Sequence, residues 1–401
     1  MKKILMLTLA AAAFTGCSKE GGNAEGPAEK LNILTSISTR SAIDGTGMPV
    51  GSSIGVHVTN NSSAYTGIDG TDDNKYLNGQ NVRFTNAAGE NNWASVNEDN
   101  TAPKQLLLGT ETGTVYAYYP FVKKVDGVGD EAAIPVSILN KGVIDVSGAT
   151  DGTNGTAPAV TAEEENDYLY DGQGSRPSVS ASTTTTAKLK MEHALARVSF
   201  IVYTANGAPK AVAGDDASTY RLGGYVIKNK TGKTLLHANV PELTEEANFS
   251  KADHAYMKIS DGTISGTLSG GQIERAVKNY VMARSASDDK TGDEAAAKAC
   301  KRVSNLVFPI ANIPVSTVNN ESVSDDLEVV FAIESYADGS ETPAKTANYA
   351  IPFAVVAGQS DSWDAGKNYT YTVKFTGTAL SIETVTVTDW TEVVGGDMEI
   401  E

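Results

Sequence analysis

Short segments in which apolar and polar residues alternate recur along the whole chain, and they constrain the fold more than any other feature. They are rich in Val, Ile, Thr and Tyr, which favour extended backbone, and turns of Gly, Asn and Asp separate them. The clearest are IGVHV (54–58), TVYAYYPF (114–121), ARVSFIVY (196–203), LEVVFAIESY (327–336) and YTYTVKF (369–375). Because a period of two places alternate side chains on opposite faces of a strand, the chain is expected to be all-β.

The spacing of these segments predicts how the strands are arranged. No regular helix lies between successive strands, so antiparallel sandwiches are favoured over a parallel sheet. One stretch, DEAAAKACKR (Asp293–Arg302), predicts a short inserted helix, in which Glu294 and Lys298 have the i,i+4 spacing of a favourable ion pair. The expected fold is two antiparallel β-sandwich domains in tandem with this one helix.

The length of the chain also favours two domains, because 401 residues exceed the usual size of one. A Ser/Thr-rich stretch, ASTTTT (181–186), gives way to a strong strand pattern at about residue 190. We therefore expect an N-terminal domain over residues 41–190 and a C-terminal domain over residues 191–401.

The N-terminus has the layout of a signal peptide. Lys2 and Lys3 precede the apolar run Ile4–Phe14, which is too short to span a hydrocarbon core of about 30 Å as a helix. A small residue, Gly16, then precedes Cys17, as in a bacterial lipobox. We expect residues 1–16 to be a lipoprotein signal peptide, Cys17 to be lipidated, and residues 18–30 to form a flexible tether. The alternative is an ordinary secreted protein in which this cysteine has no such role.

The net charge and the cysteine count restrict the function further. The formal charge of -17 becomes about -19 once Lys2 and Lys3 are removed, and such an acidic surface repels nucleic acid. With Cys17 acylated, Cys300 is the one thiol left, so no internal disulfide is expected. We expect Cys300→Ser to leave folding and assembly nearly unchanged.

Two motifs resemble catalytic ones but lack their context. GSSIG (51–55) fits a nucleophile elbow at Ser53, yet it runs into a strand rather than a helix. TGKT (231–234) lacks the earlier glycine of a phosphate loop. We expect no enzyme activity and no cofactor.

A metal site is not expected either. The four histidines are scattered, and the acidic segments DGTDDNK (69–75) and EEEND (163–167) lack the spacing of a calcium loop. We interpret both acidic segments as solvated turns, and His193, next to a core strand, as a structural residue rather than a metal ligand.

Several stretches, taken in order after the lipobox, are similar to one known family. They are ISTRSAIDG (37–45), VGSSIGVHV (50–58), VYAYYPF (115–121), DYLYDG (167–172), MEHALARVSFIV (191–202), WDAGKNYTYTVKF (363–375) and VTVTDW (385–390). Together they resemble the fimbrillin-like type V pilins of Bacteroidales. The resemblance implies two transthyretin-like sandwich domains and a place at the cell surface, in a fimbria.

The resemblance also implies a mechanism of assembly. Members of the family are exported as lipoproteins of the outer membrane, cut by an arginine-specific protease in the first strand region, and polymerised with other copies or related pilins by strand exchange. Arg40 lies at the matching position, so cleavage is expected between Arg40 and Ser41, and residues 17–40 are expected to hold the lipid tether and the removable first strand.

The residues are compatible with such an exchange. Leu31, Ile33, Thr35 and Ile37 share one face of a predicted first strand, and removing it would expose an apolar groove with unpaired backbone groups. The C-terminus offers a replacement, whose predicted donor residues are Val385, Val387, Met398 and Ile400, with a hinge at Gly395-Gly396.

The resemblance therefore implies a structural subunit of the shaft of a fimbria, supporting adhesion. The alternative is a surface lipoprotein that binds a glycan or host ligand without polymerising, with Trp93 or Trp363 as a sugar platform. Trp363 precedes a turn, Ala365-Gly366-Lys367, and we interpret it as a core or turn residue.

Overall fold

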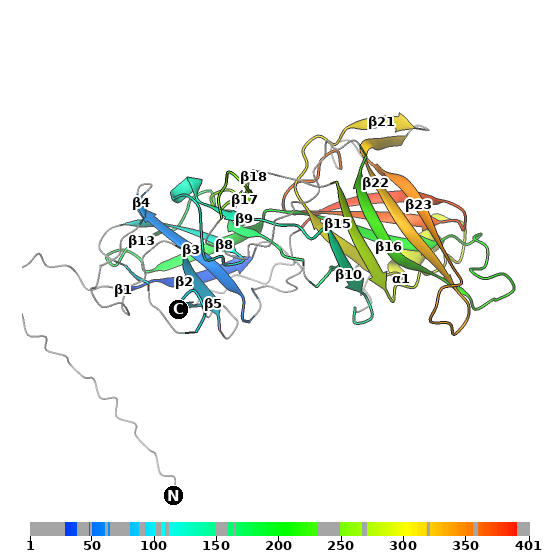
Figure 1. Ribbon diagram of the computed structural model, residues 1–401, viewed down its shortest axis with the longest axis horizontal. Helices are drawn as coiled ribbons and strands as arrows, with labels where there is room; N and C mark the ends of the chain where they lie inside the picture. The colour runs from blue at the N-terminus through cyan, green and yellow to red at the C-terminus, as the bar shows by residue number, and fades with distance from the viewer. Residues whose placement is uncertain are drawn as a thin grey trace, which may run out of the picture.

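The computed structural model confirms an all-β chain with two lobes side by side along its long axis (Figure 1). It describes residues 29–37, 48, 50–60, 63–64, 81–87, 93–101, 106–108, 112–149, 159–163, 165–230, 249–266, 271–318, 321–355 and 360–390. Cys17, Arg40, Ser41, Met398 and Ile400 lie outside these residues. Within the described part of the chain, no helix has the length and apolar character that a membrane span requires.

The first lobe is built on a nine-stranded sheet. Seven of its strands follow one another in the order β2 (Asn32–Ile37), β14 (Thr186–His193), β12 (Leu169–Asp171), β8 (Gly113–Tyr119), β3 (Ser53–Asn60), β5 (Val82–Asn86) and β6 (Trp93–Val96). Two short strands extend it: β13 (Ser178–Val179) pairs with β8, and β4 (Ser63–Ala64) with β3. A separate pair joins β1 (Glu29–Lys30) to β7 (Leu107–Leu108).

Alternate residues of these strands build the core of the first lobe. Ile54, Val56 and Val58 of β3 are fully buried in this core, and the residues between them are buried too, so β3 is covered on both faces. Gly55, between them, lets the ring of Tyr118 from β8 lie against the backbone, because a Cβ there would come within 2.0 Å of the Tyr118 Cζ. This close approach explains why a glycine stands inside a core strand.

The second lobe is a sandwich of two sheets. One has β10 (Lys141–Asp145), β19 (Gln272–Lys278), β16 (Thr219–Asn229), β22 (Glu321–Tyr336) and β21 (Val315–Val318) in order, with β23 (Lys345–Ala354) also on β22. The other has β11 (Ala159–Val160), β20 (Arg302–Val307), β15 (Ala196–Thr204), β24 (Lys367–Phe375) and β25 (Leu380–Asp389).

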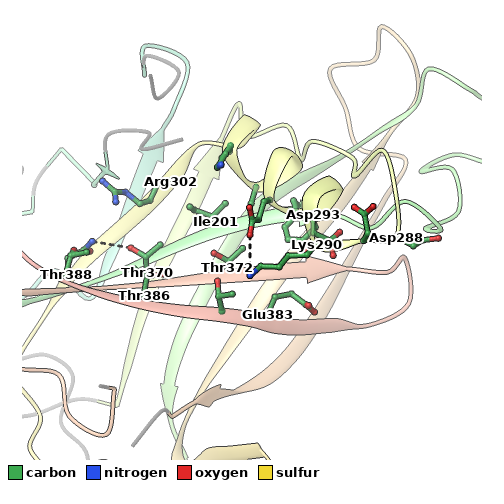
Figure 2. Close-up of a pocket in the computed structure, with 17 residues that line it drawn as sticks. Ile201, Asp288, Lys290, Asp293, Arg302, Thr370, Thr372, Glu383, Thr386 and Thr388 are labelled. Carbon is green, nitrogen blue, oxygen red and sulfur yellow. Dashed lines mark hydrogen bonds and ion pairs between the residues drawn. The ribbon is translucent and has the colours of Figure 1, made fainter. Parts of the chain in front are cut away.

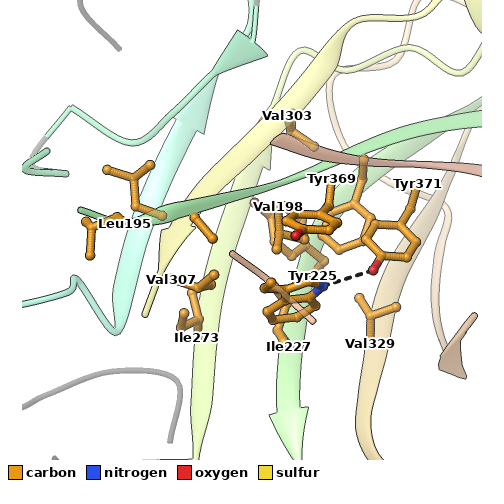
Figure 3. Close-up of a cluster of buried hydrophobic side chains, with 14 of the residues drawn as sticks. Leu195, Val198, Tyr225, Ile227, Ile273, Val303, Val307, Val329, Tyr369 and Tyr371 are labelled. Atoms are coloured by element: carbon orange, nitrogen blue, oxygen red, sulfur yellow. Dashed lines mark hydrogen bonds between the residues drawn. The ribbon is translucent and has the colours of Figure 1, made fainter. Parts of the chain in front are cut away.

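Aromatic side chains fill the space between these two sheets (Figure 3). Phe200 of β15 contacts Tyr225 of β16 and Phe331 of β22, with ring centroids 4.9 and 5.2 Å apart. Trp363 is also buried here, and its Nε1 donates a hydrogen bond to the Tyr371 hydroxyl at 3.0 Å. The interpretation of Trp363 as a core residue is confirmed.

The core of the second lobe continues into the first. A small sheet of β9 (Ala133–Pro135), β17 (Ala255–Lys258) and β18 (Ile264–Gly266) lies in the first lobe beside the 3-10 helix η1 (Gly129–Glu131), and its Ile134 and Met257 belong to the same buried cluster as the sandwich core. The chain therefore crosses between the lobes more than once, and a domain boundary near residue 190 stays a proposal.

Most strand pairs are antiparallel, as predicted, but four of the described pairs are parallel: β2 with β14, β10 with β19, β11 with β20, and β15 with β24. Each joins strands that are distant in sequence. A parallel neighbour requires a long crossover, and here whole strands and sheets intervene in place of a single helix.

The single described α-helix, α1 (Lys290–Ala299), begins and ends three residues before the predicted bounds of Asp293–Arg302. It begins early because the Asp289 side chain caps it, accepting a hydrogen bond from the Gly292 N–H at 2.8 Å. Glu294 pairs with Lys290 at 3.7 Å. Its partner therefore lies one turn before it, and not one turn after it at Lys298 as predicted.

Candidate assembly strands

Strand β2 lies at the edge of the nine-stranded sheet, where the sequence predicts a removable strand. It pairs with β14 in parallel register, from Asn32 opposite Thr186 to Ile37 opposite Met191. Its other side approaches β6, the strand at the far end of the sheet order. The sheet therefore curls so that its two end strands, β2 and β6, come close to each other.

The side chains of this segment reach into the core of the first lobe. Leu31 and Ile33 are 1% and 3% exposed, in one cluster with Ala187, Leu189 and Met191 of β14. The Leu31 N–H donates to the carbonyl of Leu106 at 2.9 Å. Thr35 and Ile37 continue the strand, but their side chains lie outside those described.

The proposed C-terminal donor begins inside an ordered strand of the second lobe. Val385 and Val387 belong to β25 and pair with Tyr371 and Tyr369 of β24. They pack against the sandwich core, whereas Thr386 between them is exposed, as the alternation predicts. These two valines are thus already part of the subunit's own sheet, which restricts a free donor to the residues after β25.

A buried tryptophan, Trp390, directly follows strand β25, and it is not among the site residues predicted from the sequence. The Trp390 N–H donates to the Gly366 carbonyl at 2.7 Å, and its ring stacks on His193 with centroids 3.8 Å apart. The Arg197 guanidinium lies 4.8 Å from the centre of the same ring. A bulky aromatic residue between an alternating strand and a Gly-Gly hinge was the signal that could have indicated this anchor.

His193 is buried and structural, as interpreted. Its Nδ1 lies 2.7 Å from Oδ2 of Asp167, and both side chains are almost fully buried. His193 is the last residue of β14, the strand that pairs with β2. The contact between His193 and Trp390 therefore connects β14 to the end of β25.

The segment 163–167 is not a wholly solvated turn, which corrects the sequence interpretation. Glu165 and Asp167 are 8% and 4% exposed. Oε1 of Glu165 lies 2.8 Å from Nη2 of Arg275 and accepts the Leu306 N–H at 2.7 Å. Burial raises the pKa of Glu165, and the charge of Arg275 opposes that shift. Segment 69–75 lies outside the described residues.

Ser53 does not form a nucleophile elbow. It begins strand β3, and its Oγ shares a hydrogen bond with Thr85 Oγ1 at 2.9 Å and accepts one from Arg83 Nε at 3.0 Å. In the described part of the chain, no three His, Cys, Asp or Glu side chains gather as metal ligands would. TGKT (231–234) lies outside the described residues.

The tryptophans proposed as a sugar platform are both buried. Trp93 is 8% exposed and belongs to the first-lobe core, and Trp363 is fully buried in the second. A platform requires an open ring face, so this form of the glycan-binding alternative is wrong.

Comparison with solved structures finds chains of similar fold at low sequence identity. A "putative cell adhesion protein" from Bacteroides ovatus ATCC 8483 is 15% identical, with 92% of this chain and 100% of that chain covered and a TM-score of 0.48. A protein so described from Bacteroides uniformis ATCC 8492 is 14% identical, with 91% and 98% covered and a TM-score of 0.47. A fimbrial protein from Bacteroides vulgatus ATCC 8482 is 10% identical, with 90% and 99% covered and a TM-score of 0.48. No protein-family model and no curated protein matches the sequence.

Proposed function

We propose that this protein is a structural subunit of a surface fimbria that supports adhesion, exported as an outer-membrane lipoprotein through Cys17. An arginine-specific protease cuts after Arg40, the segment that includes β2 is released, and a strand of another subunit takes its place. The observation that carries the proposal is the position of β2: it is an edge strand, N-terminal to Arg40, and its Ile33, with Leu31 just before it, is buried in the core of the first lobe.

The burial of β2 supplies a driving force for replacement. Each fully buried aliphatic side chain contributes about 1.5–3 kcal/mol, so losing Leu31 and Ile33 would leave an apolar groove exposed to water. Strand β14 would also lose its hydrogen-bonded neighbour along residues 186–191. An incoming strand that restores both the backbone pairing and the apolar contacts reverses these losses.

The donor in this proposal is the segment after Trp390. Because β25 is paired over its length with β24, withdrawing Val385 and Val387 would disrupt the subunit that donates. Residues 391–401 carry Met398 and Ile400 at alternating positions, beyond the Gly395-Gly396 hinge. Trp390 would hold the base of this segment while the rest reaches the next subunit.

The cleavage step is tested with two substitutions at one position. Arg40→Ala should leave the precursor monomeric after treatment with either an arginine-specific protease or trypsin, because β2 still occupies its place. Arg40→Lys should resist the arginine-specific protease but polymerise after trypsin, which also cuts at lysine. Ladders on denaturing gels without boiling report the polymers. Normal ladders from Arg40→Ala with either protease would falsify the proposed cut site.

The donor step is tested by deleting residues 391–401, which leaves β25 and Trp390 intact. The truncated subunit should be cleaved but should not polymerise alone, and it should shorten wild-type polymers by capping them. Polymers of normal length from the truncated protein alone would mean that the donor lies elsewhere.

A further inference from the structure

A groove lies in the second lobe between α1 and the outer face of the sheet formed by β15, β24 and β25 (Figure 2). Its volume is about 680 Å³, within the range of about 300–1,000 Å³ typical of small-molecule sites. The groove faces away from the sandwich core and is separate from β2. Binding in this groove would therefore not require the release of β2.

The floor of the groove is a ladder of hydroxyl groups. Thr370 and Thr372 of β24 lie opposite Thr386 and Thr384 of β25, and Thr388 extends the row. Alternate residues of neighbouring strands share a face, so these side chains project together. The apolar residues of the lining are Ile201, Tyr203 and Ala297, and Tyr203 is 1% exposed, so most of the side chains around the groove carry a hydroxyl, amide or charged group.

The charges along the groove are unevenly distributed, with an unpaired arginine at one end. Arg302 lines the groove near Thr370 and Thr388 (Figure 2), its buried Nε has no hydrogen-bond partner, and no described carboxylate forms an ion pair with it. Burial lowers the pKa of this guanidinium because it disfavours the charged form. A guanidinium in this situation is a ready partner for a carboxylate.

The opposite end is acidic. Asp288 and Glu383 lie there (Figure 2). Lys290 lies among them but pairs with Glu294 at 3.7 Å, and Asp293 is held by Lys374 at 2.6 Å, so carboxylates outnumber the lysines at this end. These carboxylates can accept hydrogen bonds from ligand hydroxyls, but they would repel a second negative group. The groove therefore fits a ligand with one carboxylate at the Arg302 end and neutral hydroxyls along the rest.

We propose that this groove binds a saccharide residue that bears a single carboxylate, a uronate or a nonulosonate, with the carboxylate on Arg302 and the sugar hydroxyls on the threonine ladder and the acidic end. Such a site would let the protein recognise an acidic glycan. It needs no exposed aromatic platform.

Calorimetric titration of the purified protein at low salt tests the site. Glucuronate and N-acetylneuraminate serve as the two carboxylated probes, with glucose and acetate as matched controls for the hydroxyls and the carboxylate. At least one carboxylated sugar should bind about tenfold more tightly than glucose or acetate, because a charge-assisted hydrogen bond and the hydroxyl contacts act together. Which of the two sugars binds identifies the class.

Two variants locate the binding. Arg302→Gln should weaken it by about tenfold or more, and Thr386→Val, at an exposed position that should tolerate the change, should weaken it several-fold. Lys345→Ala and Thr346→Val on the exposed strand β23 are the matched controls and should bind normally. Melting temperatures establish that each variant is folded.

Several outcomes would overturn the proposal. They are equal binding of acetate and the sugars, no binding of either sugar, unchanged affinity in both Arg302→Gln and Thr386→Val, or preferential binding of an acidic peptide. Because the groove is distant from β2, loss of sugar binding with normal polymer ladders would leave the proposed assembly intact.

Discussion

The imidazole of His193 stacks on the indole of Trp390, with ring centroids 3.8 Å apart and planes inclined by 17°. His193 ends the strand that pairs with β2, and Trp390 follows the last described strand. The contact therefore joins the place where a strand would be lost to the place from which a strand would be donated. The stack is buried, with Asp167 beside His193 and Arg197 over the indole.

We expect Trp390→Ala to lower the free energy of unfolding by about 3–5 kcal/mol, because it leaves a large cavity and removes the stack. Trp390→Phe keeps part of the ring contact, so its free energy of unfolding should fall by less. Urea unfolding followed by circular dichroism measures both. A loss below about 1 kcal/mol in Trp390→Ala would show that this anchor is unimportant to the fold.

The buried pair of Glu165 and Arg275 predicts a non-additive result. Arg275→Met should destabilise by about 3–5 kcal/mol, because it leaves the Glu165 carboxylate buried without its cation. The double variant with Glu165→Gln should be more stable than Arg275→Met alone, since no charge remains and the amide still accepts the Leu306 N–H. A double-mutant cycle in urea tests this, and additive losses would contradict it.

His57 predicts a dependence of stability on pH. Burial lowers its pKa from 6.5 to about 4, so the unfolded chain takes up a proton in this window before the folded chain does. Stability should therefore fall as pH drops from about 6.5 to 4, by about 3 kcal/mol from this residue.

The variant His57→Leu should remove that part of the slope, whereas His254→Gln, at a partly exposed imidazole, serves as the control. Unfolding free energies measured at intervals between pH 4 and pH 7 give the comparison. The interpretation fails if wild type and His57→Leu have parallel profiles.

Cys300 is predicted to be unreactive in the folded protein. It is 3% exposed, its Sγ accepts the Ala283 N–H at 3.2 Å, and burial raises the pKa of the thiol to about 11. In a Cys17→Ser background, a thiol reagent at pH 8 should modify it far more slowly in the native state than in urea, because the thiolate is the reacting form.

The structure also sharpens the expectation for Cys300→Ser. The hydroxyl preserves an acceptor for Ala283, so the loss of unfolding free energy should stay within about 1–2 kcal/mol despite the buried position. A larger loss, or a dimer of wild type that reducing agent dissociates, would contradict this.

The sequence by itself determined the all-β class, several of the longer strands, and which residues of the edge segments are buried. Alternation predicted the strands, the burial of Leu31 and Ile33, and the outward side of Thr386 in β25. Such patterns are readable because they depend on residues two positions apart, where the geometry of a single strand sets the direction of each side chain.

Only the tertiary structure decided which strands are neighbours. Alternation is the same whether a strand's partner is parallel or antiparallel, so β15 beside β24 could not be predicted. Glu165, in a segment predicted to be a solvated turn, is buried because it pairs with Arg275, 110 residues away in the sequence. The groove at Arg302 likewise requires α1 to lie over β24 and β25. These features arise from packing between distant segments, and local periodicity carries no information about such packing.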